Sequence, residues 1–339
     1  VDTGSNDTYN SRWTLVREFP TEVKMSFATD TKNELAHIEP EKDCCKLAEI
    51  AGFIRMCGSL ELEGFGRFKI VMPTDNPAAA RHYKKMIKDY FGVDAPLEVG
   101  QSNTIKKGVT YILTIGPAQN SEAILREIGI LMIKGGMNYF ADGIYDGIIR
   151  TKCCRKAYLR GMFMAAGTIS NPEKSHHFEI SCNSSVLASD VRRLIRTFTD
   201  LYPKIVERKK GEGVYVKDGR QILDILAIMG AHSQYLAYDN VMMMKAVKNE
   251  TNRISNCEIA NVDKVVRAAG RQIDAIEKIQ RVKGLDFLPD RLQEIALLRL
   301  AHPEAPLPEI GEMMDPPIGK SGLSKRFKKI EEIADSLTE

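Results

Sequence analysis

Apolar residues follow two different periods in the first two thirds of the chain. They alternate with polar residues in Leu60–Met72, in Phe178–Cys182 and in residues 204–216, and this alternation predicts β-strands. Helical spacing lies between these stretches and predicts helices at Pro77–Phe91, Ser121–Ile133, Val186–Leu201 and Arg220–Met229. The pattern therefore predicts a domain in which helices and sheets are mixed.

After Ala231 the alternation ends and helical spacing alone continues. It predicts a helical segment after Ala231 and a long helix at Val262–Val282, interrupted afterwards by Gly284 and Pro289. Turns rich in proline and glycine join three short helices predicted near Asp290–Ala301, Leu307–Met314 and Lys320–Ala334. We expect the C-terminal part to be entirely helical.

The N-terminal part contains an internal duplication. The segment CCKLAEIAGFIRMCGSL, which begins at Cys44, aligns without gaps on CCRKAYLRGMFMAAGTI, which begins at Cys153. The register persists, because KKMI at Lys84 matches RRLI at Arg192, and KKG recurs in the hairpin turn of each copy. Three matches in the same order predict two structurally equivalent repeats.

These patterns divide the chain into an αβ domain, a connector and a C-terminal helical domain. The expected boundaries are residues 25–230 for the αβ domain, with repeats at about 40–135 and 150–230, then 231–284 and 285–339. Residues 1–24 are polar, lack any period and contain the single tryptophan, Trp13. We expect them to be a disordered or non-native extension, with an ordered terminal arm as the alternative.

Each copy of the repeated helix has two glycines, Gly52 and Gly58 in the first copy and Gly161 and Gly167 in the second. Glycine destabilises a helix by about 0.5–1 kcal/mol relative to alanine, so paired glycines indicate a close approach of two backbones. We expect these residues to pack the two repeats together. The alternative is that each glycine ends its helix, which accounts for Gly58 and Gly167 but not for the other two.

At these residues the sequence resembles the LAGLIDADG homing-endonuclease fold, through IAGFIRMCGS at Ile50 and LRGMFMAAGT at Leu159. The resemblance implies an α+β fold in which two such helices lie side by side and each presents one metal-binding carboxylate just before its last glycine. Hard divalent ions need oxygen ligands. The two carboxylate positions are Cys57 and Ala166 here, so we predict no catalytic residues and no enzyme activity.

The other positions near this motif give no replacement for the lost carboxylates. The earlier acidic position of the motif is Arg55 in one copy and Met164 in the other. Glu61 and Glu63 lie on a strand of alternating polarity, where we expect solvated side chains. An active metal-dependent endonuclease that uses these two glutamates is the enzyme alternative.

The whole span from Met25 onward also resembles the WhiA family of bacterial regulators of cell division and sporulation. The residues that carry the resemblance are MSF at Met25, ERKKG at Glu207, NRISNCEIANVDK at Asn252, GLDFLPDRLQEIALLR at Gly284 and GKSGLSKRFKKIEEIA at Gly319. The resemblance implies a degenerate LAGLIDADG-like domain followed by a helix-turn-helix. It also implies a function in transcription regulation during the cell cycle, cell division, chromosome segregation or sporulation.

The last predicted helix indicates DNA binding independently of the family. Leu323, Phe327, Ile330 and Ala334 form an apolar stripe, and the opposite face is basic. Such a helix suits the major groove of double-stranded DNA. The expected DNA-binding residues are Lys320, Ser321, Ser324, Lys325, Arg326, Lys328 and Lys329, and candidate phosphate contacts at the hairpin turns are Lys106, Lys107, Lys209 and Lys210.

Composition narrows the remaining function classes. The 48 basic and 45 acidic residues give a net charge of +3, so only local clustering of charge can indicate a polyanionic partner. No stretch approaches the ~18 apolar residues of a membrane span, and no secretory leader is evident. We therefore expect a cytoplasmic, nucleoid-associated protein that has no membrane partner.

The cysteines and the glycine-rich segments do not predict a cofactor. Adjacent pairs, Cys44-Cys45 and Cys153-Cys154, favour reduced thiols, and they lack the two-residue separation of zinc ligands, so we expect structural burial without metal. Residues 319–321 (GKS) resemble the end of a phosphate-binding loop, but Met314 occupies the position of its earlier glycine. We expect no cofactor and no small-molecule substrate.

A second alternative concerns the partners. The duplicated domain could be a protein-interaction scaffold that docks another transcription regulator and is anchored on DNA by the terminal helices. This function is compatible with DNA binding.

Overall fold

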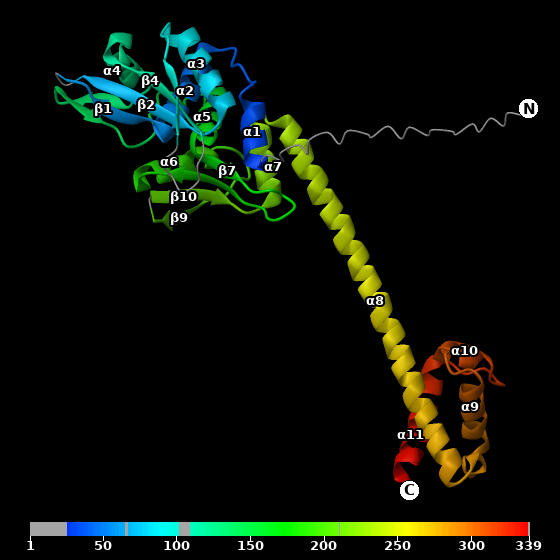
Figure 1. The fold of residues 1–339 in the computed structure, drawn as a ribbon. Helices are drawn as coiled ribbons and strands as arrows, with labels where there is room; N and C mark the ends of the chain where they lie inside the picture. The colour runs from blue at the N-terminus through cyan, green and yellow to red at the C-terminus, as the bar shows by residue number, and fades with distance from the viewer. Residues whose placement is uncertain (1–25, 65–66, 102–108, 210, 338–339) are drawn as a thin grey trace, which may run out of the picture. The chain divides into compact units, whose positions relative to one another are not determined.

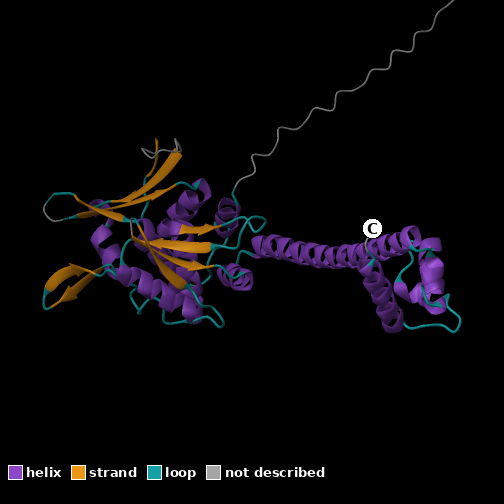
Figure 2. Cartoon of the chain, turned by 90° about the horizontal axis from the view of Figure 1, so that it is seen from below, coloured by secondary structure: helices purple, strands orange, loops and turns teal. Residues whose placement is uncertain are grey.

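The computed structural model describes residues 26–64, 67–101, 109–209 and 211–337. The chain forms two compact units, Val1–Met243 and Met244–Glu339, which we call unit 1 and unit 2 and describe separately. Residues 1–24, with Trp13, lie outside the described residues. Figure 2 shows that the described strands belong to unit 1 and that unit 2 is helical.

The described part of unit 1 starts with a helix, followed by the first repeat (Figure 1). In chain order the elements are α1 (Phe27–Leu35), α2 (Asp43–Cys57), β1 (Ser59–Leu62), β2 (Phe68–Thr74), α3 (Pro77–Phe91), β3 (Leu97–Gln101), β4 (Val109–Ile115), the short helix η1 (Pro117–Gln119), α4 (Ser121–Glu127), β5 (Leu131–Lys134) and β6 (Met137–Phe140). The sheet of this repeat is antiparallel with strand order β1-β2-β4-β3.

The second repeat follows the same plan. Its elements are α5 (Lys152–Ala166), β7 (Gly167–Ile169), β8 (Phe178–Cys182), α6 (Ser185–Arg196), β9 (Lys204–Arg208), β10 (Gly211–Val216) and α7 (Gly219–Met229). Its antiparallel sheet has strand order β7-β8-β10-β9, which matches the first sheet element for element. The duplication in the sequence is therefore a duplication of fold.

Local sequence explains where the helices begin and end. The side chain of Asn76 accepts a hydrogen bond from the amide of Ala79, which caps α3, and Pro77 occupies the first turn, where its missing N–H is harmless. Gly92 ends α3 with a φ of 68°, a conformation that favours glycine. In the second repeat Ser184 caps α6 in the same way as Asn76 caps α3.

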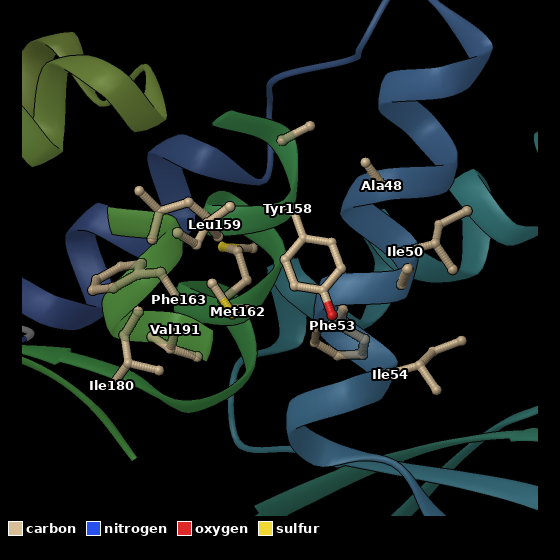
Figure 3. Packing of buried hydrophobic residues seen from close by; sticks show 14 of the residues in the cluster. Ala48, Ile50, Phe53, Ile54, Tyr158, Leu159, Met162, Phe163, Ile180 and Val191 are labelled. Atoms are coloured by element: carbon tan, nitrogen blue, oxygen red, sulfur yellow. The ribbon is translucent and has the colours of Figure 1, made fainter. Parts of the chain in front are cut away.

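The paired helices α2 and α5 form the centre of unit 1 (Figure 3). A Cβ atom at Gly52 would overlap the carbonyl oxygen of Tyr158, and one at Gly161 would overlap that of Glu49, so the backbones approach closely at these two residues. Gly58 and Gly167 are in a different position, since each ends its own helix and lies against residues of that helix.

Aromatic and aliphatic side chains fill the space around the paired helices. Phe53 of α2 stacks on Tyr83 of α3 with ring centroids 3.7 Å apart, and Phe163 of α5 stacks on Phe178 of β8 at 5.6 Å. These rings are fully buried, and they connect each central helix to its own repeat. Figure 3 shows the side chain of Tyr158 of α5 directed toward Phe53 of α2.

Three sequence-based helix boundaries are wrong. The helix predicted at Val186–Leu201 ends at Arg196. The helix predicted at Ser121–Ile133 ends at Glu127, because Gly129 adopts a φ of 68° and the chain then forms the hairpin β5–β6. The helical segment after Ala231 and the helix at Val262–Val282 are one continuous helix, α8 (His232–Val282).

Unit 2 contains the C-terminal part of α8 and the elements that follow it. These are the short helix η2 (Leu285–Phe287), α9 (Asp290–Ala301), α10 (Leu307–Glu312) and α11 (Lys320–Ser336). Unit 2 has its own hydrophobic core, formed by Ile276, Ile279, Leu288, Leu292, Ile295, Ile310, Met314, Leu323, Phe327 and Ile330 among others. In the described part of the chain, no helix combines the length and the apolar character that a membrane span requires.

Candidate nucleic-acid interface

Helix α11 has one buried face and one exposed basic face. Leu323, Phe327, Ile330 and Ala334 are at most 2% exposed and pack in the core of unit 2. Their spacing turns the remaining positions outward. The predicted contact residues Lys320, Ser321, Ser324, Lys325, Lys328 and Lys329 are all exposed.

Arg326 differs from these neighbours. Its side chain is half-buried, and its Nη1 atom is buried without a hydrogen-bond partner among the described residues. A guanidinium in this position lies at the boundary between the two faces of α11. The structure therefore makes Arg326 less accessible to a ligand than the four lysines.

The buried Arg299 of α9 connects α11 to the loop before α10. Its Nη1 atom donates to the carbonyl oxygen of Ala305 at 2.7 Å and to that of His302 at 3.3 Å. The guanidinium also lies 5.3 Å from the ring centroid of Phe327. The sequence pattern does not reveal this contact of Arg299, because a basic residue on a surface helix is usually solvated.

A tight turn before α11 fixes where the basic face begins. A Cβ atom at Gly311 in α10 would overlap the carbonyl oxygen of Ile318, so only glycine allows this approach. The amide of Ile318 donates to the carbonyl of Gly311 at 2.9 Å. Helix α11 then starts at Lys320 after Gly319, without a side-chain cap, so its first-turn N–H groups have no side-chain acceptor at the N-cap position.

The positions of the endonuclease carboxylates lie where each central helix meets the first strand of its sheet. Cys57 donates from its Sγ to the carbonyl of Phe53, and burial raises the pKa of its thiol to about 12. The equivalent position in α5 is Ala166, which has no ligand atom. Among the described residues, no group of three or more Asp, Glu, His or Cys side chains converges at these helix ends.

The other positions near the motif have structural partners. Arg55 donates to the carbonyl oxygens of Gly129 and Ala141, the residues that bracket the β5–β6 hairpin. Glu61 on β1 forms an exposed ion pair with Lys69 at 3.5 Å. These contacts stabilise the first repeat and place no carboxylate at the end of α2. Met164 is fully buried in the core, and Glu63 is exposed.

On the second sheet, the basic residue Arg208 forms an ion pair with Glu179. Arg208 of β9 donates from Nε to the Oε1 atom of Glu179 at 3.2 Å, and His177 Nε2 lies 2.9 Å from Glu179 Oε2. Burial raises the pKa of Glu179, but the hydrogen bonds and charges of Arg208 and His177 lower it by more than burial raises it. The pKa of Glu179 therefore lies below the ordinary value of a glutamate. The charge of Arg208 is therefore already compensated within the sheet.

Of the four lysines predicted at the hairpin turns, Lys209 is exposed in the turn between β9 and β10. Lys106, Lys107 and Lys210 lie outside the described residues. These four residues remain candidate phosphate contacts.

Known families match nearly the whole described chain. The model of the WhiA N-terminal LAGLIDADG-like domain matches residues 43–131, that of the WhiA LAGLIDADG-like domain matches 155–248, and that of the WhiA C-terminal HTH domain matches 251–334. The third match contains α9, α10 and α11.

Curated relatives and a solved structure agree with these matches. A protein of Alkaliphilus oremlandii named "Probable cell division protein WhiA" is 44% identical over 316 residues, which cover 93% of this chain and 98% of the relative. A protein of the same name from Thermoanaerobacter pseudethanolicus is 42% identical over 315 residues, or 93% of this chain and 99% of the relative. The crystal structure of full-length DUF199/WhiA from Thermatoga maritima aligns with a TM-score of 0.56 at 24% identity and covers 93% of this chain and 100% of that one. The chain therefore belongs to the WhiA family, with two LAGLIDADG-like domains followed by a helix-turn-helix domain.

Proposed function

We propose that this protein is a DNA-binding regulator that holds duplex DNA through the exposed face of α11 and does not cleave it. The observation that carries the proposal is the separation of faces on that helix, with four exposed lysines opposite a fully buried apolar stripe. A helix of this kind, third in a helix-turn-helix domain, fits the major groove.

The positive charges on the exposed face of α11 support DNA binding at this face. Lys320, Lys325 and Lys329 have no ion-pair partner among the described residues, and Lys328 has only a distant one, Glu332 at 3.9 Å. Cations that lack a protein partner are available to neutralise phosphates, and the counterions released in this way supply a large share of the affinity of proteins for DNA. The N-terminus of α11 adds the positive end of its helix dipole beside Lys320.

The central helices support a non-catalytic role for the LAGLIDADG-like domains. Two-metal cleavage needs carboxylate oxygens at the helix ends. A neutral thiol at Cys57 and a methyl group at Ala166 give no such ligands. We infer that these domains serve as a rigid scaffold for the DNA-binding domain and as a docking surface for another regulator.

The relatives point to the process that is regulated. Their name assigns them to cell division. We infer that this chain acts on genes or chromosomal sites used in cell division, chromosome segregation or sporulation, and that it is found in the cytoplasm on the nucleoid.

Full-length protein mixed with bacterial genomic fragments tests both parts of this proposal. Mobility shifts at increasing KCl concentration measure binding, and parallel samples with Mg²⁺ or Mn²⁺, run on denaturing gels, measure cleavage. We expect retarded fragments that remain intact in every sample. Magnesium-dependent cutting would contradict the non-catalytic role, and a failure to bind at low salt would contradict the DNA-binding role.

A further inference from the structure

The two adjacent cysteine pairs meet in space at the N-terminal ends of the central helices. Cys44 and Cys45 lie in the first turn of α2, and Cys153 and Cys154 lie in the first turn of α5. Because α2 and α5 pack side by side in equivalent positions, all four Sγ atoms lie within 4.8 Å of one another. Among the described residues, these four cysteines are the group of three or more potential metal ligands whose ligand atoms lie close enough together to share one ion.

The arrangement is close to a tetrahedral thiolate site. Zinc held by four thiolates at about 2.3 Å implies sulfur–sulfur distances of about 3.8 Å. The four Sγ atoms are therefore within about 1 Å of that geometry, which rotation of the side chains can close. Four sulfur ligands select a soft or borderline ion such as Zn²⁺ and discriminate against Mg²⁺ and Ca²⁺.

The surroundings can compensate the charge of such a site. A zinc ion with four thiolates carries a net charge of −2, and the N-terminal ends of both helices present the positive poles of their dipoles to it. Cys45 and Cys153 also line a cavity of about 550 Å³, together with Lys42, Lys156 and the acidic Glu41. Arg160 lines the same cavity but is paired with Glu49, so Lys42 and Lys156 are the lysines of this lining that can offset the charge of the site.

Exposure and hydrogen bonding suit a structural ion that enters from solvent. Cys45 and Cys154 are buried, whereas Cys44 is exposed and Cys153 is half-buried, so the cluster has one open side. The hydroxyl of Thr151, which caps α5, lies 3.1 Å from Cys153 Sγ. A hydroxyl at this distance can donate to a ligating thiolate and orient it.

We propose that Cys44, Cys45, Cys153 and Cys154 bind one Zn²⁺ ion that joins the two LAGLIDADG-like repeats. Two ligands come from each repeat, so the ion links the N-terminal ends of α2 and α5. The close backbone contacts at Gly52 and Gly161 hold the same two helices together near their middles. The site stabilises the scaffold and takes no part in DNA recognition.

Metal analysis of the full-length protein tests this proposal. The protein is purified under reducing conditions, treated with a strong chelator and then titrated with Co²⁺, whose thiolate complexes have intense charge-transfer bands in the near ultraviolet and tetrahedral bands in the visible. We expect saturation at one Co²⁺ per chain, displacement by one equivalent of Zn²⁺, and a lower melting temperature for the chelated protein than for the zinc-loaded one. Failure to bind Co²⁺ or Zn²⁺ would overturn the proposal.

Variants locate the ion and separate loss of ligands from loss of folding. Cys44→Ser/Cys153→Ser removes the two more accessible ligands, and we expect it to fold but to lose stoichiometric binding. Cys257→Ser, an exposed cysteine in α8, and Cys182→Ser, a buried one in β8, are matched controls that should bind one ion. Unchanged binding in the double variant, or an inter-repeat disulfide with no metal bound after its reduction, would refute the site.

Discussion

The Nε atom of Arg160 in α5 lies 2.9 Å from the Oε2 atom of Glu49 in α2, so a buried ion pair crosses the interface between the two repeats. Glu49 Oε1 lies 3.2 Å from His82 Nε2, and Arg160 Nη1 donates to the carbonyl oxygen of Met229 at 3.1 Å. Burial alone would lower the pKa of Arg160, but the Glu49 carboxylate raises it, so the guanidinium remains charged. This network connects α2, α3, α5 and the end of α7.

Removing one member of this pair should destabilise unit 1. Glu49→Leu leaves the buried Arg160 without its counter-ion, and we expect the free energy of unfolding to fall by about 3–5 kcal/mol. Glu49→Leu/Arg160→Met removes both charges and should recover much of that loss. Hydrogen exchange of α2 and α5 peptides in urea measures unit 1 alone, and it is recorded for Glu49→Leu, for Arg160→Met and for the double variant. Strictly additive effects of the two single variants would contradict a coupled pair.

Substituting the contact glycines should separate the paired helices. Gly52→Ala or Gly161→Ala places a methyl group against a carbonyl oxygen of the other helix, and we expect a loss of about 1–3 kcal/mol in the free energy of unfolding. Gly270→Ala in α8 is the matched control, since a Cβ there meets nothing within 4 Å. The control should stabilise its helix by up to about 1 kcal/mol. Equal effects of all three variants in thermal unfolding would contradict the contact role.

The sequence predicts these paired helices and misses other elements for identifiable reasons. Gly52 and Gly161 are recognisable because the duplication repeats them at the same place. The strand β5 is missed because Leu131 and Ile133 continue the helical spacing of α4, and only Gly129 marks the break. The middle of α8 is exposed around its whole circumference, so no apolar stripe shows that the helix is continuous.

Long-range polar contacts are the part that local patterns do not predict. Glu49 and Arg160 are 111 residues apart, and each one alone has the pattern of a solvated helix residue. The spacing within each cysteine pair does not indicate a metal site, whereas the duplication aligns Cys44 with Cys153 and so places both pairs at the same end of two neighbouring helices. On α11 the lysines are exposed as their spacing predicted, but the half-buried position of Arg326 depends on tertiary packing.

Substitution of Arg299 should destabilise unit 2. Arg299→Met leaves the carbonyl of Ala305 without its 2.7 Å donor, and we expect the free energy of unfolding of unit 2 to fall by about 1–3 kcal/mol. Faster proteolysis in the loop between α9 and α10 would report this change. Arg281→Met, an exposed residue of α8, is the control and should leave cleavage unchanged. Equal cleavage rates for both variants would contradict a structural role for Arg299.

The depressed pKa of Glu179 predicts acid sensitivity of the second sheet. A carboxyl whose pKa is lower in the folded than in the unfolded protein stabilises the fold at pH values above its pKa in the unfolded protein, which is about 4.3 for glutamate. This stabilisation is lost as the pH falls through the lower pKa of the folded protein. Glu179→Gln should therefore have a lower free energy of unfolding than the parent at pH 6. Between pH 6 and pH 3 its free energy of unfolding should fall by less than that of the parent. Glu207→Gln on β9 is the exposed control. Unfolding by urea at both pH values measures the difference, and identical pH dependence in parent and Glu179→Gln would contradict it.

The salt dependence of DNA binding tests whether α11 is the DNA-binding surface. The full-length protein is compared with the variant Lys320→Ala/Lys325→Ala/Lys328→Ala/Lys329→Ala and with Lys88→Ala, an exposed lysine of α3. Each phosphate contact contributes about −0.9 to the slope of log K against log salt concentration, so the quadruple variant should bind more weakly and show a slope shallower by about 3–4. Lys88→Ala should match the parent. An unchanged slope in the quadruple variant would show that α11 is not the DNA-binding surface.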